Sequence, residues 1–197
     1  MNKPRKLFLA SSSPRRAEIL DALGIDFSAG GVDLDEVRAD GEAPDAMVLR
    51  LASEKAAVAR LTRSNPVLAA DTAVVVDSTV FGKPRDQADA LNMLKRLSGR
   101  SHQVMTGVAL HWAEQQLTAL SVNEVTFREI GPDEARAYWQ SGEPCDKAGA
   151  YAIQGLGGVF VERISGSYSG VVGLPVYETA ELLAAAGIEV FRGVASK

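Results

Sequence analysis

The stretch Pro66–Asp86, P-V-L-A-A-D-T-A-V-V-V-D-S-T-V-F-G-K-P-R-D, restricts the possible folds more than any other part of the chain. Two short apolar runs, Val67–Ala70 and Ala73–Val76, surround Asp71, and a Gly-Lys-Pro-Arg-Asp turn follows. Short Val-rich runs bounded by turn residues predict buried strands. Because burying an unpaired carboxylate is costly, we expect Asp71 to end the first strand and face a cleft that contains cations. The first candidates for those cations are Lys83 and Arg85.

Length and composition narrow the class of protein. The chain has 197 residues, of which 46% are hydrophobic, so it can bury a sizeable core as one domain or as two small lobes sharing a cleft. We treat residues 1–197 as a single domain. A net charge of −4 argues against a general nucleic-acid binder, whose affinity comes from a basic surface.

Cysteine and histidine are scarce. Cys145 is the only cysteine, which excludes an internal disulfide and a thiolate metal cluster, and two histidines make a His-based metal site unexpected. No apolar run has the length of a membrane span, and the run Leu7–Ala10 after the basic N-terminus is too short for a signal peptide. We therefore expect a soluble protein of the reducing cytoplasm.

The remaining pattern mixes strands and helices, which predicts an α/β or α+β fold. Strands are expected at Lys6–Ala10, Ile25–Val32, Val67–Ala70, Ala73–Val76, Thr79–Phe81, Val104–Trp112, Leu117–Phe127, Val159–Ile164 and Ile188–Phe191. Helices are expected from Pro14 to the stop at Gly24, and at Pro44–Leu61, Asp86–Leu97, Pro132–Ser141 and Pro175–Ala186. Two glycine-rich loops are expected at Glu143–Gly158 and Ser165–Gly173.

Two segments have both an ordinary and a functional interpretation. Ser11–Arg16, S-S-S-P-R-R, places Ser13 at an N-cap and Pro14 at the first helical position. It is either an ordinary cap with solvated arginines or an anion site at a helix N-terminus. The acidic segment around Asp35 and Glu36 is either a solvated loop or the source of one metal ligand.

Lys55 lies on or beside the apolar stripe of the helix predicted at Pro44–Leu61. It either extends along the surface to solvent or reaches an anion in a cleft. We favour the anion, because Glu54 and Arg60 already supply the polar face.

Charged residues at strand ends, helix starts and glycine loops together indicate a site for a polyphosphate and a divalent metal. The cations are Arg15, Arg16, Lys55, Lys83, Arg85 and Lys147, and the anions are Glu36, Asp71, Asp86 and Asp146. The sequence has no P-loop motif, no G-x-G-x-x-G motif and no G-x-S-x-G elbow. This counts against a P-loop protein, a Rossmann dinucleotide-binding protein and a serine hydrolase of the elbow type.

Seven ordered motifs resemble the Maf family of nucleoside triphosphate pyrophosphatases. They are S-S-S-P-R-R at 11–16, E-K-A at 54–56, A-A-D-T at 69–72, G-K-P-R-D at 82–86, L-S-G at 97–99, D-K-A-G-A-Y at 146–151 and Q-G at 154–155. The resemblance implies an elongated mixed sheet with flanking helices and two lobes around a cleft, as in inosine triphosphate pyrophosphatases. It also implies that the protein is a homodimer. The implied reaction is hydrolysis of a nucleoside triphosphate to the monophosphate and pyrophosphate, with a divalent cation, Mg or Mn, as cofactor.

The resemblance also implies residue roles. Asp71 corresponds to the proposed general base, and Glu36, with Asp35 as the alternative, to a glutamate of the acidic loop that would hold the metal with Asp71. The phosphate-side residues are Ser11, Ser13, Arg15, Arg16, Lys55 and Lys83, and the D-K motif adds Asp146 and Lys147 to the substrate-binding set.

Three positions match the subgroup that acts on dTTP and UTP, namely Arg15, Thr72 and Gln154. A glutamine amide offers one donor and one acceptor group, which suits the N3–H and O4 edge of uracil or thymine. The alternatives are a 7-methyl-GTP pyrophosphatase, a nucleotide-binding regulator of cell division without catalysis, and a phosphatase that cuts at the γ-phosphate.

Overall fold

This computed structural model describes residues 6–190, which contain seven strands and six α-helices. The strands are β1 (Leu7–Ala10), β2 (Phe27–Gly30), β3 (Val67–Val76), β4 (Thr79–Phe81), β5 (Ser101–Trp112), β6 (Gln115–Phe127) and β7 (Val161–Ser165). The helices are α1 (Pro14–Ala22), α2 (Pro44–Arg60), α3 (Gln87–Leu97), α4 (Pro132–Gln140), α5 (Tyr168–Val172) and α6 (Val176–Ala185). Short 3₁₀ turns are η1 (Glu143–Asp146), η2 (Ala148–Ala150) and η3 (Leu156–Phe160).

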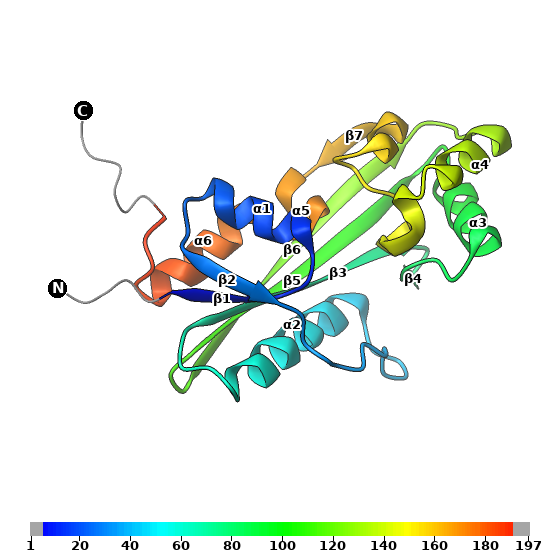
Figure 1. Cartoon of the computed structure of the whole chain (residues 1–197). Coiled ribbons are helices and arrows are strands. Elements are labelled where there is room, and N and C mark those ends of the chain that lie inside the picture. The colour runs from blue at the N-terminus through cyan, green and yellow to red at the C-terminus, as the bar shows by residue number, and fades with distance from the viewer. Residues whose placement is uncertain (1–5, 191–197) are drawn as a thin grey trace, which may run out of the picture. The chain divides into compact units, whose positions relative to one another are not determined.

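The strands form one mixed sheet in the order β2-β1-β3-β5-β6-β7, with β4 paired to β3 (Figure 1). β1 runs parallel to both of its neighbours, whereas β4 and β7 pair antiparallel with β3 and β6. The predicted α/β class is therefore confirmed. No helix within residues 6–190 is long and apolar enough to cross a membrane.

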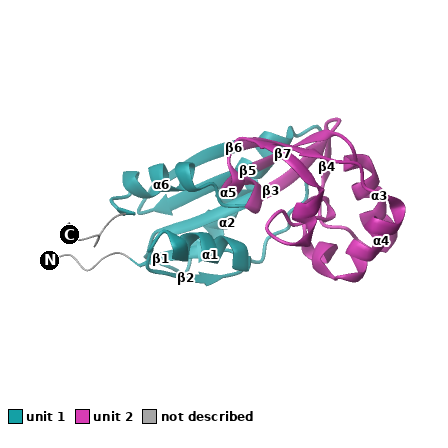
Figure 2. Ribbon diagram, turned by 90° about the horizontal axis from the view of Figure 1, so that it is seen from above, with its two compact units in different colours: residues 1–71, 106–121, 173–197 teal, residues 72–105, 122–172 magenta. Residues whose placement is uncertain are grey.

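The chain divides into two compact units, coloured in Figure 2. Unit 1 comprises residues 1–71, 106–121 and 173–197, and unit 2 comprises residues 72–105 and 122–172. β3, β5 and β6 each contribute residues to both units, and the first change of unit falls between Asp71 and Thr72.

Unit 1 has an apolar layer on each face of its strands. On one face, Phe8 and Ala10 of β1 pack with the alanines of α2. On the other face, Leu7 and Leu9 of β1 pack with α1 and α6, so that α2 lies across the strands from α1 and α6 (Figure 1). Adjacent strand residues point to opposite faces, which explains why every residue of β1 is buried.

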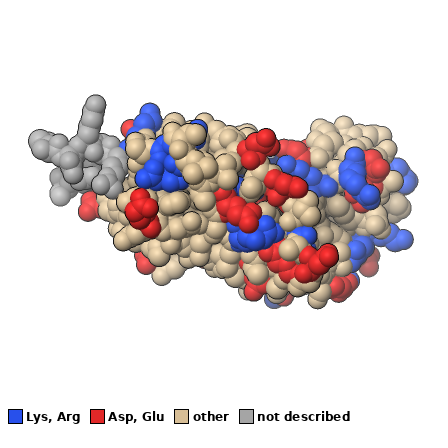
Figure 3. Space-filling view, turned by 90° about the horizontal axis from the view of Figure 1, so that it is seen from below, with Lys and Arg blue, Asp and Glu red and all other residues tan. Residues whose placement is uncertain are grey.

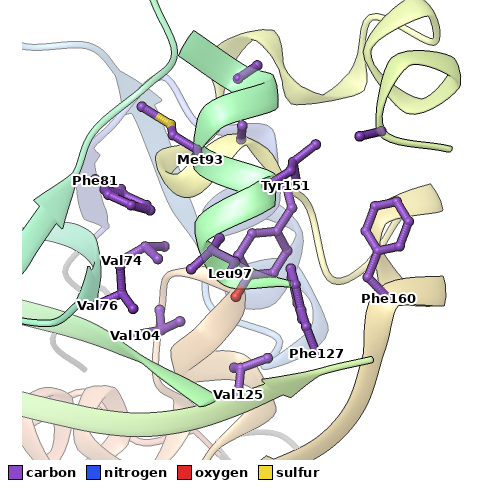
Figure 4. Close-up of a cluster of buried hydrophobic side chains, with 14 of the residues drawn as sticks. Val74, Val76, Phe81, Met93, Leu97, Val104, Val125, Phe127, Tyr151 and Phe160 are labelled. Atoms are coloured by element: carbon purple, nitrogen blue, oxygen red, sulfur yellow. The ribbon is translucent and has the colours of Figure 1, made fainter. Parts of the chain in front are cut away.

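Unit 2 has its own core, in which α3 and α4 cover β3, β5 and β6. Aromatic rings come together there (Figure 4), with the ring centroids of Phe127 and Tyr151 4.7 Å apart in an edge-to-face contact. The turn at Asp77–Ser78 joins β3 to β4 with positive φ at both residues, +48° and +60°. This is the backbone geometry that a two-residue hairpin favours.

Three predictions about the elements were wrong. Asp71 does not end a strand, because Val67–Val76 is one continuous strand with Asp71 inside it. The segment predicted as a loop at Ser165–Gly173 contains α5. Residues 188–190 form no strand, because the Ile188 N–H bonds to the Leu183 carbonyl at 2.9 Å and closes the end of α6, while residue 191 lies outside the described residues.

His102 should make the stability of the fold depend on pH. It is 3% exposed in unit 2, and its Nε2 lies 2.9 Å from the Tyr151 hydroxyl. Burial, and then the charge of Arg100, lower the pKa of His102 from 6.5 to about 4. The unfolded chain therefore binds this proton at a higher pH than the folded chain, so the stabilisation is complete above pH 6.5 and is lost as the pH falls towards 4.

We expect the free energy of unfolding to fall by up to roughly 1.4 kcal/mol per pH unit within that window because of His102. Urea denaturation of the wild type and of His102→Phe between pH 4 and 7 measures the effect as the difference between their pH slopes. Equal slopes in the two proteins would show that other groups cause the acid sensitivity.

Candidate active site

A lysine held between two carboxylates forms the centre of the candidate site, within unit 1. Lys55 Nζ lies 2.6 Å from Asp71 Oδ1 and 2.8 Å from Glu36 Oε1. Lys55 and Asp71 are each only 7% exposed, whereas the side chain of Glu36 is 52% exposed. Buried charges require partners, and this pairing explains how the interior of β3 can carry Asp71.

Residue spacing places this pair at one helix–strand interface. On β3, Val67, Ala69 and Asp71 share a face, because strand side chains alternate, and Val67 and Ala69 pack in the same apolar cluster as Ala52 and the other alanines of α2. Lys55 comes three residues after Ala52 on the same side of α2. Of the two predicted alternatives, Lys55 therefore reaches an anion and not solvent.

The serine-rich turn between β1 and α1 positions Arg16. Ser13 occupies the N-cap of α1, as predicted, although its side chain makes no capping hydrogen bond. Ser11 Oγ instead accepts hydrogen bonds from the backbone N–H of Ser13 at 3.2 Å and from Arg16 Nη1 at 3.3 Å. Arg16 Nε donates to the Gly173 carbonyl at 2.8 Å. The guanidinium is thus held by the chain on both sides.

Electrostatic interactions connect Arg16 to the carboxylates of the site. Burial is the main cause that lowers the pKa of Arg16, and the nearby charge of Arg15 lowers it further, whereas Asp71 and Glu36 raise it. An arginine stays protonated in proteins. Arg16 therefore lies within electrostatic range of Arg15, Asp71 and Glu36 in unit 1.

The remaining predicted site residues belong to unit 2. Thr72 follows Asp71 on β3 and is half-buried, while Lys83 and Gln154 are exposed. Asp146 and Lys147 form an ion pair with each other. Their roles towards a substrate, like those of Ser11, Ser13 and Arg15, stay predictions.

The cations expected beside Asp71 need a correction. Arg85 forms an exposed ion pair with Asp89 at 3.0 Å, and the cation hydrogen-bonded to Asp71 is Lys55. Asp86, counted among the anions of the site, caps α3 by accepting from the Asp89 N–H at 2.8 Å.

Comparison with known proteins identifies the family. The model of the family described as "Maf-like protein" matches residues 6–186, nearly the whole chain and all of the motifs above. The chain belongs to the Maf family. This match confirms the resemblance to the Maf family that the motifs indicated.

Curated Maf relatives match over almost their whole length. A dTTP/UTP pyrophosphatase of Saccharophagus degradans is 51% identical over 96% of this chain and 92% of its own. A dTTP/UTP pyrophosphatase of Pseudoalteromonas translucida is 52% identical over 90% of this chain and 95% of its own. Among solved structures, a HAM1 protein from Coxiella burnetii aligns with 62% of this chain and 72% of its own at a TM-score of 0.46 and 20% identity. The predicted relation to inosine triphosphate pyrophosphatases stays a prediction.

The carboxylates of this Maf chain fit a divalent metal of the magnesium type. No group of three or more His, Cys, Asp or Glu residues that could hold a metal occurs within residues 6–190. Magnesium does not need such a group, since one or two carboxylates and the substrate phosphates hold it in many enzymes. Asp71 and Glu36 converge on one point, at Lys55 Nζ, and so provide that smaller set.

Sequence reasoning missed two contacts, one in each unit. The Gly173 carbonyl fixes Arg16 from a position 157 residues later in the chain, and no local pattern predicts such a pairing. Glu143 binds the backbone next to Gln154. The closely spaced glycines that follow Gln154 were the available signal for this second contact, because they allow another group to approach the backbone.

Proposed function

We propose that this protein hydrolyses dTTP and UTP to the nucleoside monophosphate and pyrophosphate. The observation that supports this most is the buried Lys55–Asp71 pair with Glu36, beside Arg16, in a Maf chain that is about half identical to dTTP/UTP pyrophosphatases. Positive groups neutralise phosphate charge, and a fixed carboxylate can orient a nucleophile. The match of Arg15, Thr72 and Gln154 to the pyrimidine subgroup supports the choice of base.

In the proposed reaction a water molecule attacks the α-phosphorus, and the bond from that phosphorus to the bridging oxygen of pyrophosphate breaks. Lys55 holds Asp71 through Oδ1, so we assign Oδ2 to orient the water and accept its proton. Arg16, fixed by Ser11 and Gly173, binds phosphoryl oxygens as negative charge moves onto the leaving pyrophosphate. We place Lys83 with the phosphates as well.

We also propose a divalent metal, Mg or Mn, held by Asp71 and Glu36 together with phosphate oxygens. When bound, it supplies positive charge that neutralises the phosphates and polarises the phosphoryl group. On the resemblance to the family we propose a cytoplasmic homodimer. On the face drawn in Figure 3, basic and acidic side chains are interspersed.

One substrate panel tests the function. Purified protein with Mg or Mn should release pyrophosphate from dTTP and UTP much faster than from CTP or 7-methyl-GTP, and chromatography should identify the monophosphate as the other product. Preference for 7-methyl-GTP would favour that alternative, and NDP plus phosphate would indicate cleavage at the γ-phosphate. Nucleotide binding without turnover of any substrate would favour a regulator of cell division.

A further inference from the structure

Glu143 makes a set of hydrogen bonds that the proposed reaction does not use. Its Oε1 accepts from the Tyr138 hydroxyl at 2.7 Å and from the Gly157 N–H at 2.9 Å, and its Oε2 accepts from the Leu156 N–H at 2.9 Å. One carboxylate thus binds two successive backbone N–H groups and fixes the backbone at Leu156 and Gly157. These residues end the loop 152–157, which contains Gln154.

Tyr138 fixes the other end of the same loop. Its hydroxyl, while donating to Glu143, accepts a hydrogen bond from the Ala152 N–H at 3.1 Å. Tyr138 is 6% exposed on α4 and makes an edge-to-face contact with Phe160, with the ring centroids 5.1 Å apart. The loop is therefore attached at its first residue to Tyr138, which packing holds in place, and at its far end to Glu143, which is hydrogen-bonded to the same tyrosine.

The glycines of the loop are shaped to this pair of side chains. A Cβ at Gly155 would lie 2.1 Å from Glu143 Oε2, and a Cβ at Gly157 would lie 2.5 Å from the Tyr138 hydroxyl oxygen. Both distances are far below van der Waals contact, so any other residue at these positions would displace the carboxylate or the hydroxyl. Gln154 comes immediately before Gly155, and its exposed side chain is therefore carried on a backbone of defined course.

The charge of Glu143 suits this role. Burial raises the pKa of Glu143, but the hydrogen bonds from the Gly157 N–H, Tyr138 and the Leu156 N–H outweigh burial, so that the pKa lies below its ordinary value. Hydrogen bonds to a charged acceptor are about twice as strong as neutral ones.

We propose that Glu143, acting with the Tyr138 hydroxyl, is a positioning residue that determines specificity for uracil and thymine over cytosine by holding the Gln154 loop in the conformation that binds the base. This inference rests on the proposed function, and it adds how the base is selected. Glu143 touches no reacting atom. Its loss should therefore weaken binding of uracil and thymine nucleotides and leave the chemical step intact.

The test compares Glu143→Gln, Glu143→Ala and Tyr138→Phe with the wild type, using dTTP, UTP and CTP as substrates. Glutamine keeps one acceptor oxygen and alanine keeps none, so KM for dTTP and UTP should rise about tenfold in Glu143→Gln and further in Glu143→Ala. Tyr138→Phe should raise KM in the same direction. In all three, kcat should stay within about twofold, and the preference for dTTP over CTP should shrink by the same factor as KM grows.

Asp77→Asn is the matched control, because it removes the exposed Arg100–Asp77 pair, also in unit 2, without touching the loop. An unchanged KM and dTTP/CTP ratio in folded Glu143→Gln and Tyr138→Phe would overturn the inference, as would an equal loss for all three nucleotides. If Glu143→Ala does not fold, the other two variants decide. A wild type that hydrolyses neither dTTP nor UTP contradicts the proposed function before any variant is measured, so the two failures are distinguishable.

Discussion

Asp71→Asn is expected to lower kcat for dTTP and UTP by about 10²–10⁴-fold, the range that a lost general base costs. Asparagine has nearly the same shape as aspartate, but its amide cannot accept the proton of the attacking water. Steady-state pyrophosphate release at saturating nucleotide measures the effect. The control is Asp77→Asn, an equivalent exchange at an exposed turn beyond the end of the same strand, which should keep wild-type activity.

The structure also predicts that Asp71→Asn stays folded. Breaking a buried ion pair typically costs about 3–5 kcal/mol, because it leaves one charge unpaired. In this variant Lys55 keeps Glu36 at 2.8 Å, so we expect a smaller loss of unfolding free energy, measurable by urea denaturation. Full activity in a folded Asp71→Asn protein would rule out Asp71 as the base.

Gly107→Ala should cause a large loss of stability in unit 1. A Cβ at Gly107 on β5 would lie 2.5 Å from the Val48 carbonyl oxygen and 2.8 Å from the Leu49 nitrogen. These are backbone atoms of α2, which cannot turn aside as a side chain can. Overpacking of this kind costs about 1–3 kcal/mol and occasionally more, and we expect a loss of about 3 kcal/mol in the free energy of unfolding.

Urea denaturation of Gly107→Ala and of Gly82→Ala tests the argument. Gly82 has open space around its Cβ position, so its alanine variant should stay within about 0.5 kcal/mol of the wild type. Because Gly107 contacts the helix that carries Lys55, the Gly107→Ala protein should also lose activity at temperatures where it is still folded. Equal stability of the two variants would show that α2 and β5 can separate without cost.

Local patterns predicted most of the elements, and long-range pairing explains what they missed. The apolar stripe of α2 and the N-cap position of α1 depend on residues a few positions apart, so they could be inferred from the sequence. The partner of Asp71 could not, because Lys55 lies 16 residues earlier and meets it only through packing of helix on strand. Because no partner for Asp71 was evident, the cost of burying an unpaired carboxylate led to the prediction that the strand ends at Asp71, whereas β3 continues to Val76.

The candidate site divides in the same way. Family motifs contain Lys55 and Asp71, and the family resemblance implied Glu36, with Asp35 as the alternative. The structure shows that Asp71 and Glu36 both contact the ammonium group of Lys55. Glu143 and the loop glycines lie within one short region beside the last two motifs, yet residue types alone do not show which carboxylate binds which N–H. That information depends on the backbone course of η1 and η3, whose short 3₁₀ turns have no strong sequence signature.

The passage of β3, β5 and β6 through both units has a consequence for how the protein emerges from the ribosome. Unit 2 is complete in sequence at residue 172, whereas the core of unit 1 also needs Leu182 and Leu183 of α6. β1 comes long before α6 in the chain, so the face of β1 that packs with α1 and α6 is fully covered only after α6 has been synthesised. Late closure between distant segments is the slow step in such topologies, so Leu7 and Leu9 stay incompletely covered in the nascent chain until then, when chaperones can bind them.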